Sequence, residues 1–301
     1  MIKPADATVL VTGGAQGIGL GIARAFVGAG ARVALADRDQ EQLERARANL
    51  GDQAVVTTHR LDVTDPAAYA QVVDQIEDDL GPITVLCNNA GIGGAEELAE
   101  DNFGLWDDIL RINLGGVING IKVVLPRMLR RGGPGHLVNT ASGAGLVQGG
   151  SPIYTGSKFA VVGISEALAA HPDLLRADIG VTVLCPGMVQ TSIATNTATH
   201  HPLSTQGRQI ADQLDAMLQR VGVSPEQVGQ QVLEAVRTGQ LFVQTDRMLA
   251  DAISDRHRRL LESLPAETER DRQVAAWYAD REERRAAAEE TIAVLDGPNT
   301  D

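Results

Sequence analysis

Short apolar runs alternate along the chain with stretches of helical length. In the first such stretch Ile18, Ile22, Ala25 and Phe26 follow the spacing of one helix face. Short apolar strands that alternate with helices are typical of a parallel sheet covered by helices on both faces. The pattern therefore predicts an α/β protein with a doubly wound, seven-stranded parallel sheet. The seven runs are TVLVT (8–12), RVALA (32–36), QAVVTT (53–58), ITVLC (83–87), HLVNTA (136–141), VTVLC (181–185) and LFVQT (241–245).

The length of the chain suits one large domain with a tail. Its 301 residues are 44% hydrophobic, which is ample for a buried core. We expect one domain over residues 1–245, in which residues 188–224 lack strand character and form a lid. A helical extension over residues 246–301 follows. Val274, Trp277 and Tyr278 share one face of it, and we expect them to pack on a neighbouring subunit or the lid rather than form a separate interaction module.

Charge and cysteine content argue against several classes of function. The net charge of −13, without a basic stripe, argues against a nucleic-acid partner. The start, MIKPADATVL, lacks a basic region before an apolar stretch, and no run of about eighteen apolar residues is visible, so we expect neither export nor a membrane span. Cys87 and Cys185 each end an apolar run, which indicates buried, reduced thiols. These features predict a cytoplasmic protein.

The first strand runs directly into a glycine-rich turn, TGGAQGIG at 12–19, and a helix follows at once. Gly13, Gly17 and Gly19 let the backbone approach a pyrophosphate, and the helix N-terminus supplies N–H groups and a partial positive charge. A tight connection alone could use the same glycines. The order of strand, glycines, helix and a later acidic residue nevertheless favours dinucleotide binding in a Rossmann-type fold.

That acidic residue is Asp37, at the end of the second strand. A carboxylate there can accept the adenosine ribose hydroxyls and repel a 2′-phosphate, which favours NAD over NADP. Arg38 keeps NADP open, because it could hold a 2′-phosphate or lie over the adenine. Asp37 could instead cap the next helix, DQEQLERARANL, a role that Asp39 could serve equally well.

Polar residues also follow the third and fourth strands. Asp62 and Val63, in LDVTD, could border an adenine or simply belong to a loop that caps the next helix. Amides and a glycine follow the fourth strand at the edge of the sheet where ligands bind, although a turn would use the same residue types. These residues are Asn88, Asn89, Ala90 and Gly91.

The candidate chemistry lies between Ser142 and Lys158. Tyr154 and Lys158 stand four residues apart on a predicted helix, so an ammonium lies beside a phenol. A neighbouring cation favours phenolate, so we expect the pKa of Tyr154 to fall toward working pH and the side chain to act as an acid or base. Ser142 could hydrogen-bond the same substrate oxygen. Lysine is rare here, with only Lys3 and Lys122 besides, which indicates that this ammonium matters.

As an ordered set, these residues resemble the short-chain dehydrogenase/reductases. The resemblance covers about residues 6–245, and its motifs follow one another in the order of that family. It implies a Rossmann-type fold, a nicotinamide cofactor and an alcohol or ketone substrate. The motifs are TGxxxGxG at 12–19, Asp37, Asp62-Val63, NNAG at 88–91, Asn113, Ser142, YxxxK at 154–158 and CPGMVQT at 185–191.

The resemblance also implies residue roles. Tyr154 would be the acid/base, and Lys158 would lower its pKa and bind the nicotinamide ribose. Ser142 would hold the substrate oxygen, and Asn113 would anchor a water in the proton relay. The catalytic set is Asn113, Ser142, Tyr154 and Lys158, and the cofactor-binding set is Gly13, Gln16, Gly17, Ile18, Gly19, Asp37, Arg38, Asp62, Val63, Asn89, Ala90, Gly91, Tyr154, Lys158, Pro186, Gly187, Val189 and Thr191.

Two features depart from the family pattern. Ser142 and Tyr154 are separated by twelve positions rather than the more usual thirteen, which shortens one wall of the pocket. Pro172 is expected to break a helix that often runs longer and commonly forms a subunit interface. We therefore expect a homodimer or a homotetramer.

The predicted lid indicates a neutral substrate. It carries Arg208 and Arg220 and no lysine, which argues against a phosphorylated or CoA-bearing substrate. We interpret His200-His201 as a polar loop rather than a metal site, because no Cys or acidic ligand is nearby in the sequence. Apolar lid residues expected at the pocket are Met188, Ile193, Leu203, Ile210 and Met217.

The sequence thus favours an NAD-dependent oxidoreductase that interconverts a bulky, neutral secondary alcohol and its ketone. A looser resemblance, carried by GVINGIKVVLPRML, the long lid and a Trp-bearing C-terminal helix, is to bacterial dehydrogenases that oxidise benzylic alcohols of lignin-type β-aryl ethers. One alternative is an NADPH-dependent ketone reductase. Another is a non-catalytic nucleotide-sensing protein, which would have little need for the whole catalytic set.

Overall fold

A computed structural model describes residues 2–51, 54–94, 103–197 and 201–281. The chain divides into two compact units, Met1–Ile253 and Ser254–Asp301. The first unit is a single Rossmann-type domain, and it contains every candidate site residue. The remainder of the predicted extension, residues 282–301, lies outside the described residues, as do His200 and part of the third predicted strand.

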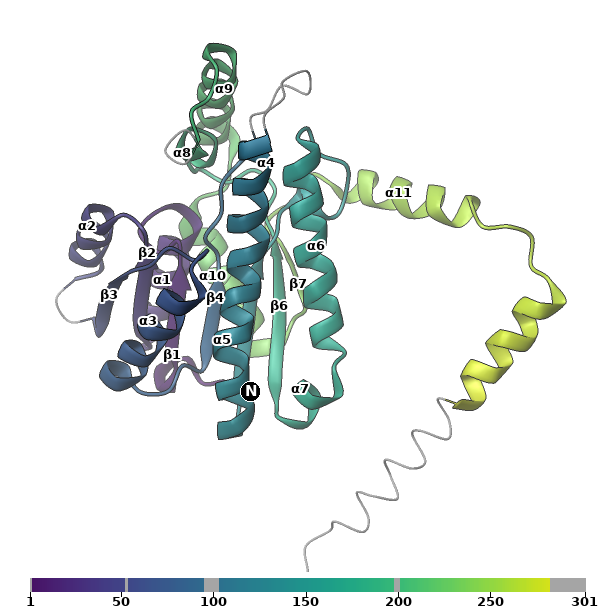
Figure 1. The fold of residues 1–301 in the computed structure, drawn as a ribbon, viewed down its shortest axis with the longest axis horizontal. Helices are drawn as coiled ribbons and strands as arrows, with labels where there is room; N and C mark the ends of the chain where they lie inside the picture. Colours follow the sequence, from purple (N-terminus) through teal and green to yellow (C-terminus); the bar gives the residue numbers. More distant parts are fainter. Residues whose placement is uncertain (1, 52–53, 95–102, 198–200, 282–301) are drawn as a thin grey trace, which may run out of the picture. The chain divides into compact units, whose positions relative to one another are not determined.

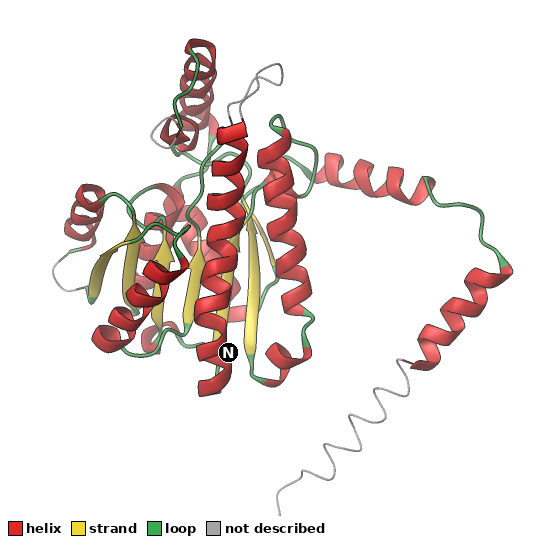
Figure 2. Ribbon diagram, in the orientation of Figure 1, coloured by secondary structure: helices red, strands yellow, loops and turns green. Residues whose placement is uncertain are grey.

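Seven parallel strands form one sheet in the order β3-β2-β1-β4-β5-β6-β7, with helices on both faces (Figures 1 and 2). The predicted doubly wound sheet is therefore confirmed. The apolar runs became strands because their side chains are buried on both faces, as in Thr8–Thr12, where all five residues are buried. The strands are β1 (Thr8–Thr12), β2 (Arg32–Asp37), β3 (Val56–Arg60), β4 (Val85–Asn88), β5 (Gly135–Thr140), β6 (Ile179–Cys185) and β7 (Phe242–Gln244).

Hydroxyl or carboxylate side chains cap five of the helices at their N-termini. They are Asp39, Asp65, Ser151, Ser204 and Ser224, each of which accepts a hydrogen bond from a backbone N–H in the first turn. The α-helices are α1 (Gly17–Gly28), α2 (Gln40–Leu50), α3 (Pro66–Leu80), α4 (Phe103–Leu110), α5 (Gly116–Arg131), α6 (Pro152–Ala169), α7 (Pro172–Arg176), α8 (Ile193–Thr197), α9 (Thr205–Val221), α10 (Pro225–Thr238) and α11 (Ala250–Glu262), with short turns η1 (Pro4–Asp6), η2 (Arg111–Gly115) and η3 (Gly143–Gly145).

Two hydrophobic clusters lie on the two faces of the sheet. Along β1 the side chains alternate, so that Leu10 joins one cluster while Val9 and Val11 join the other. The Leu10 face is covered by α3, α5 and α6, and the opposite face by α1, α2 and α10 (Figure 1). Helices α1 and α10 pack closely, because a Cβ at Gly21 would lie only 2.0 Å from the Pro225 oxygen.

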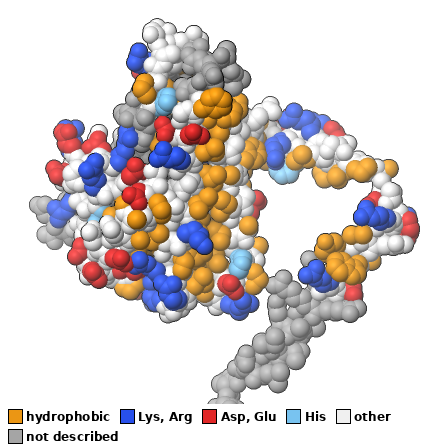
Figure 3. All heavy atoms as spheres, viewed as in Figure 1, with side chains coloured by type: hydrophobic (Ala, Val, Ile, Leu, Met, Phe, Trp, Pro, Cys, Tyr) orange, Lys and Arg blue, Asp and Glu red, His pale blue; other side chains and the backbone are white. Residues whose placement is uncertain are grey.

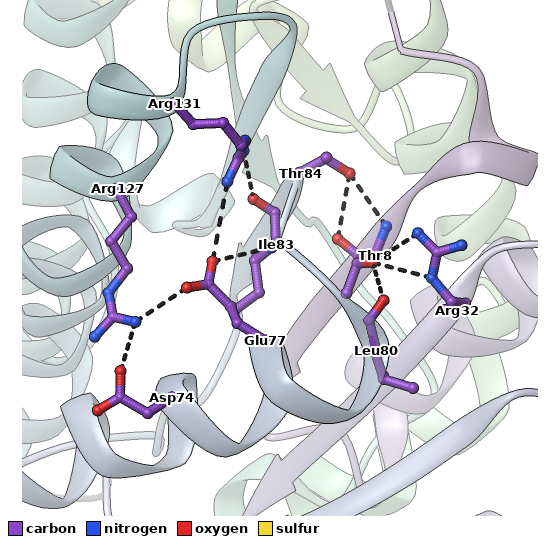
Figure 4. Close-up of polar contacts among 9 residues, drawn as sticks. All are labelled: Thr8, Arg32, Asp74, Glu77, Leu80, Ile83, Thr84, Arg127 and Arg131. Atoms are coloured by element: carbon purple, nitrogen blue, oxygen red, sulfur yellow. Dashed lines mark hydrogen bonds and ion pairs between the residues drawn. The ribbon is translucent and has the colours of Figure 1, made fainter.

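Ion pairs anchor the far end of α5 to α3 (Figure 4). The Arg127 guanidinium lies 2.7 Å from Asp74 and 3.0 Å from Glu77, and Glu77 also accepts a hydrogen bond from the Ile83 N–H. Arg131 donates to the Ile83 carbonyl at 2.9 Å. These contacts fix the rotation of α5 about its own axis. The other end of α5 continues directly from η2.

Segment Phe103–Arg131, made of α4, η2 and α5, is long and apolar enough by length and composition to cross a membrane. Half of its most apolar window is buried inside the fold, and Val117, Val124 and Met128 belong to the core cluster beside the sheet. This burial, together with the ion pairs of Arg127, is the pattern of a core helix. No other described helix passes the same test of length and apolarity.

Helices α8 and α9 belong to the predicted lid. A small cluster of Ala194, Leu203 and Ala211 holds them together. Pro172 begins α7 directly after α6 ends at Ala169, as the sequence indicates for this proline.

The second unit is helical where the structure describes it. It holds the last part of α11 and a helix over residues 269–281. The Trp277 and Tyr278 rings meet edge to face with centroids 5.0 Å apart, and both side chains are more than half exposed. Their packing on another subunit or the lid stays a prediction.

Candidate active site

A cavity of about 360 Å³ opens at the carboxyl ends of the strands. It lies where the strand order changes direction between β1 and β4, the position at which open α/β sheets bind ligands. Loops after six strands and the lid contribute its walls. The predicted residues that line it are Gly13, Gln16, Gly17, Ile18, Asp37, Arg38, Asp62, Val63, Asn89, Ala90, Gly91, Ser142, Tyr154, Lys158, Pro186, Gly187, Val189 and Thr191.

The glycine-rich turn has a shape that other residues would strain. Gly13 and Gly17 have φ of 62° and 52°, in the left-handed region. A Cβ at Gly13 would lie 2.9 Å from the Ala90 Cα, so the turn also needs the missing side chain for space. Gly19 has a packing role, and its predicted approach to a pyrophosphate stays a prediction. It lies behind the cavity wall, where a Cβ would meet the Gly13 oxygen at 2.1 Å, and so it allows α1 to pack on the turn.

The N-terminus of α1 points into this turn without a side-chain cap. Its N-cap residue, Gln16, makes no capping hydrogen bond within the described structure, in contrast to the helices capped by a Ser or Asp side chain. First-turn N–H groups that no side chain satisfies are suited to an anion, whose charge the helix dipole also favours. The residues present therefore fit the pyrophosphate of a dinucleotide.

Asp37 lies at the opposite end of the cavity from Tyr154. Its two carboxylate oxygens accept hydrogen bonds from the N–H groups of Ala15 and Asp39, both at 3.3 Å. Burial raises the pKa of Asp37, and the backbone donors partly offset that rise. Asp39, not Asp37, caps α2, by accepting from the Gln42 N–H at 3.0 Å. The alternative reading of Asp37 as a helix cap is therefore wrong.

Asn89 ties three strand ends together. Its amide nitrogen donates to the carbonyl oxygens of Thr12 at 3.1 Å and Gly13 at 3.3 Å, and its amide oxygen accepts from the Thr140 hydroxyl at 3.3 Å. The neighbouring Asn88 turns into the core instead, where it donates to Asn139 at 2.9 Å. Asn89 thus holds the floor of the cavity in place at the ends of β1, β4 and β5.

Lys158 is a buried amine that faces the reaction end of the cavity. Its side chain is on a residue only 4% exposed, and Nζ donates to the Thr140 carbonyl at 3.1 Å. Nζ lies 5.6 Å from the centroid of the Tyr154 ring. Desolvation lowers the pKa of Lys158 to about 8, because burial disfavours the charged form.

Tyr154 does not have the lowered pKa that the sequence predicts. Burial raises the pKa of its phenol, and the hydrogen bond with the Ser142 side chain only partly offsets this. The prediction considered the charge of Lys158 but not the desolvation of both groups. The structure does bring Ser142, Tyr154 and Lys158 to one cavity wall, and Ser142 also accepts from the Ala144 N–H at 3.1 Å.

Asn113 lies behind the cavity wall, in the π-helical turn η2. It is fully buried, and its amide pairs with the backbone of Ile92 in both directions, at 2.8 Å and 2.9 Å. Its nitrogen also lies 3.5 Å from the Ser157 hydroxyl. A π-turn inside a helix is often found at a functional site, and here it points Asn113 toward the loop after β4. Asn113, for which the family resemblance implies a water-anchoring role, thus uses its side chain to bind the backbone of Ile92.

Several cavity residues are absent from the sequence prediction. Most come from the lid and from the loops beside predicted residues, so only proximity in sequence could have indicated them. Of the apolar lid residues expected at the pocket, Ile193 lines the cavity, whereas Leu203 packs in the lid cluster and Ile210 and Met217 are exposed. The additional lining residues are Asp39, Gln42, Leu61, Ile92, Ile112, Thr140, Ala141, Ser192, Asn196 and Leu218.

His201 contacts a carboxylate rather than a metal-binding cluster. Its Nδ1 lies 3.3 Å from an Asp108 oxygen. No group of three His, Cys, Asp or Glu side chains that could hold a metal ion occurs among the described residues.

Comparison with known proteins finds that this chain is similar to dehydrogenases. The family model described as short chain dehydrogenase matches residues 7–202. A 1-deoxy-11-beta-hydroxypentalenate dehydrogenase from Streptomyces arenae is 39% identical over 188 residues, which is 60% of this chain and 67% of that protein. A C alpha-dehydrogenase from a Sphingobium species is 29% identical over 293 residues, 92% of this chain and 94% of its own length.

Solved structures of similar fold hold either form of the cofactor. A short chain dehydrogenase/reductase from Burkholderia phymatum in complex with NAD aligns with a TM-score of 0.80 and 27% identity, covering 89% of this chain and 99% of that one. An actinorhodin polyketide ketoreductase with NADPH aligns with a TM-score of 0.66 and 32% identity over 81% and 96% of the two chains. The family thus uses NAD or NADP.

Proposed function

We propose a specific reaction for this chain, which belongs to the short chain dehydrogenase family of oxidoreductases. The protein interconverts a bulky, neutral secondary alcohol and its ketone, with NAD(H) as cofactor and Tyr154 as acid/base. One observation carries the proposal. A single cavity joins the Gly13–Gly17 turn and Asp37 at one end to Ser142, Tyr154 and Lys158 at the other.

The cavity residues fit a dinucleotide. The uncapped first turn of α1 would hold the pyrophosphate, Asp37 the adenosine ribose, and Lys158 with the loop Pro186–Thr191 the nicotinamide end. Asp62 and Val63 line the cavity near the adenosine end. When bound, the cofactor supplies the hydride exchange with the carbinol carbon.

The protein's own part is to hold the substrate oxygen and move its proton. The Ser142 hydroxyl and the Tyr154 phenol, hydrogen-bonded to each other, face the same cavity and can bind one oxygen between them. Since burial raises the pKa of Tyr154, the resting phenol is a proton donor, which suits ketone reduction. In alcohol oxidation the phenolate must form first, and the Lys158 ammonium, 5.6 Å from the ring, would stabilise it.

The lid end of the cavity supports a neutral substrate. The described lining residues there are apolar, such as Ile193 and Leu218, or uncharged and polar, such as Ser192 and Asn196. Among the described lining residues the cations are Arg38, beside Asp37, and Lys158, which is hydrogen-bonded to the Thr140 carbonyl. Similarity to the Sphingobium C alpha-dehydrogenase along nearly the whole chain supports an aryl secondary alcohol as the first compound to test.

The preference for NAD rests on Asp37. Backbone N–H groups, among them those of Ala15 and Asp39, hold the carboxylate, which can still accept from a ribose hydroxyl, and its negative charge opposes a 2′-phosphate. Arg38 lines the same cavity end, which is the observation that keeps an NADPH-dependent ketone reductase as the second candidate.

A calorimetric titration with NAD⁺, NADH, NADP⁺ and NADPH tests the cofactor, and turnover of a panel of aryl and alkyl secondary alcohols and ketones tests the reaction. Tighter binding of the unphosphorylated pair together with turnover is the expected result. Tighter binding of the phosphorylated pair would favour the ketone reductase. Binding without turnover of any compound would favour a nucleotide-sensing protein.

We also expect a homo-oligomer in the cytoplasm. Trp106, Leu110 and Ile118 on the long helix are each about 40% exposed, and hydrophobic side chains gather in a band along this face (Figure 3). Such a band is typical of an interface between subunits. Light scattering coupled to size-exclusion chromatography would give the mass of the assembly, and a monomer would contradict the expectation.

A further inference from the structure

The loop after β4 connects three parts of the candidate active site. Residues Ile92–Gly94 run between the lid helix α8, the π-turn η2 and the first turn of α6. Each of these elements makes a direct contact with the loop. The loop is therefore the place where the position of the lid could affect the catalytic groups.

Thr197 joins this loop to the lid. Its side chain is fully buried, and its hydroxyl accepts a hydrogen bond from the Gly93 N–H at 3.0 Å. The hydroxyl proton can go to the carbonyl of Gly93 or of Ile193, both 3.2 Å away. One side chain on α8 thus lies within hydrogen-bond distance of both backbone groups of a residue 104 positions earlier.

Asp215, on α9, holds α8 from the other side. Its carboxylate is on a residue only 8% exposed and accepts from the N–H groups of Ala194 at 3.1 Å and Thr195 at 2.9 Å, and from the Thr195 hydroxyl at 2.6 Å. These bonds fix the first turn of α8. Ile193 and Asn196 of that short helix line the lid end of the cavity.

The other side of the loop contacts the catalytic groups. Ile92 pairs with the Asn113 amide through both its N–H and its carbonyl. Gly94 lies so close to α6 that a Cβ there would be 2.2 Å from the Ser151 oxygen and 3.1 Å from the Tyr154 Cβ. Ser151 in turn accepts from the Tyr154 N–H at 3.2 Å. A shift of the loop would therefore displace Asn113 or Tyr154.

We propose that Thr197 is a positioning residue, which couples the lid helix to Asn113 and Tyr154 through Gly93. A substrate that contacts α8 would then influence the placement of the acid/base group at the other side of the loop. This inference rests on the proposed function, since it assigns Thr197 a part in the same reaction. It assigns no contact between Thr197 and the substrate.

Thr197→Val is the primary test, because it keeps the shape and removes the hydroxyl. It leaves the N–H of Gly93 buried without its partner, and we expect kcat/KM to fall about 10- to 100-fold, chiefly through kcat. The affinity for NADH, whose expected adenosine site lies at the other end of the cavity, should stay within about twofold. Thr197→Ser, which restores the hydroxyl, should recover most of the loss.

Thr238→Val is the matched control. The Thr238 hydroxyl also bonds the carbonyl four residues earlier, at 2.9 Å, but it lies exposed on α10. We expect no change in turnover. A loss of kcat in Thr197→Val that is no greater than in Thr238→Val would overturn the coupling.

A double variant tests the route through Asn113. If Thr197 acts through Ile92 and Asn113, adding Thr197→Val to Asn113→Ala should reduce kcat/KM by less than threefold beyond Asn113→Ala alone, an order-of-magnitude expectation for coupled residues. If the losses of kcat/KM in the two single variants simply multiply in the double variant, Thr197 does not act through Asn113.

Amide hydrogen exchange gives a readout that needs no substrate. In Thr197→Val, exchange should accelerate in peptides covering residues 92–94 and the first turn of α6 as well as α8. Acceleration confined to α8 would overturn the coupling. Should Thr197→Val not fold, Asp215→Asn loosens the same helix from α9 and must accelerate exchange in the same three segments. A wild-type protein that turns over no compound would refute the proposed function, whereas the exchange pattern would still decide the coupling.

Discussion

The charged side chains at the two ends of the cavity differ in how far they are buried. At the reaction end Lys158 is almost fully buried, and desolvation lowers its pKa to about 8. At the adenosine end Asp37 is half-buried and receives backbone hydrogen bonds, and Arg38 and Asp39 beside it are exposed. Burial strengthens electrostatic effects but costs solvation, so it suits a group that exchanges a proton with the substrate or a charge that stabilises the group that does so. A group that only recognises a hydroxyl can remain near water.

This difference predicts different consequences of mutation. Changes at the reaction end should affect the rate and the pH dependence of stability, since the groups there are desolvated. Changes at the adenosine end should alter the choice of cofactor and affect the rate less.

Tyr154→Phe should have the largest effect. Removal of the phenol oxygen should reduce turnover by about 10²- to 10⁴-fold, the range for loss of a general acid or base, while cofactor affinity changes little. Steady-state kinetics and calorimetry measure the two quantities. Tyr69→Phe is the matched control, because its buried hydroxyl donates to Asn88 at 3.3 Å away from the cavity. Unchanged turnover in Tyr154→Phe would refute the proposed mechanism.

Lys158→Met should change how stability depends on pH. The pKa of Lys158 is lowered from 10.5 to about 8, so above pH 8 the unfolded chain binds more protons than the folded one and stability rises with pH until about 10.5. The full contribution is up to roughly 3 kcal/mol, and the whole penalty is present below pH 8.

The difference in unfolding free energy between wild type and Lys158→Met reports this contribution together with the electrostatic interaction between Lys158 and Cys185. The buried thiols Cys87 and Cys185, whose pKa values are raised by burial, act in the opposite direction in both proteins. Denaturant unfolding at pH 7, 8, 9 and 10 without cofactor provides the measurement. A difference that does not vary with pH would mean that Lys158 is not desolvated as described.

Asp37→Asn should act on the cofactor rather than on the rate. Loss of the negative charge removes repulsion of a 2′-phosphate, so the ratio of NADPH to NADH affinity should rise about 10- to 100-fold, with kcat nearly unchanged. Calorimetric titration of both cofactors measures the ratio. Arg38→Gln provides the opposing variant, and a larger change there than in Asp37→Asn would identify Arg38 as the main determinant.

Asp39→Ala should have the smallest effect. It removes the cap of α2 and should lower the free energy of unfolding by about 1 kcal/mol. Cofactor preference should stay the same, although Asp39 lines the cavity beside Asp37. A shift in preference as large as that of Asp37→Asn would show that the two carboxylates act together at this end.

The strands could be predicted where burial on both faces makes a run continuously apolar. The third strand was the least well placed: it covers Val56–Arg60 instead of 53–58, because it is an edge strand with a mixed pattern in which Val55 is 53% exposed and His59 is buried. The cavity residues from the glycine turn, Asp37 and the Tyr154–Lys158 pair also follow from sequence, because short-range spacing places them at strand ends or on one helix face.

The remainder depends on contacts between distant segments. The pKa of Tyr154 could not be predicted from the spacing to Lys158, since spacing reveals a neighbour but not the loss of water around both groups. Thr197 and Gly93 meet across 104 positions, and no local pattern marks either residue. Asn113 gave a signal only through the family resemblance, and its tertiary partner Ile92 is invisible in the sequence around it.

The π-turn η2 has a consequence for the length of the chain itself. A π-turn holds about one residue more than an α-turn, so it amounts to a single-residue insertion between α4 and α5. Deleting one residue from 111–115 would rotate the two halves of the helix against each other by about 100°. Either Asn113 would turn away from Ile92, or Arg127 would leave Asp74 and Glu77 (Figure 4). The extra residue therefore lets Asn113 face Ile92 while Arg127, further along the same helical segment, faces α3.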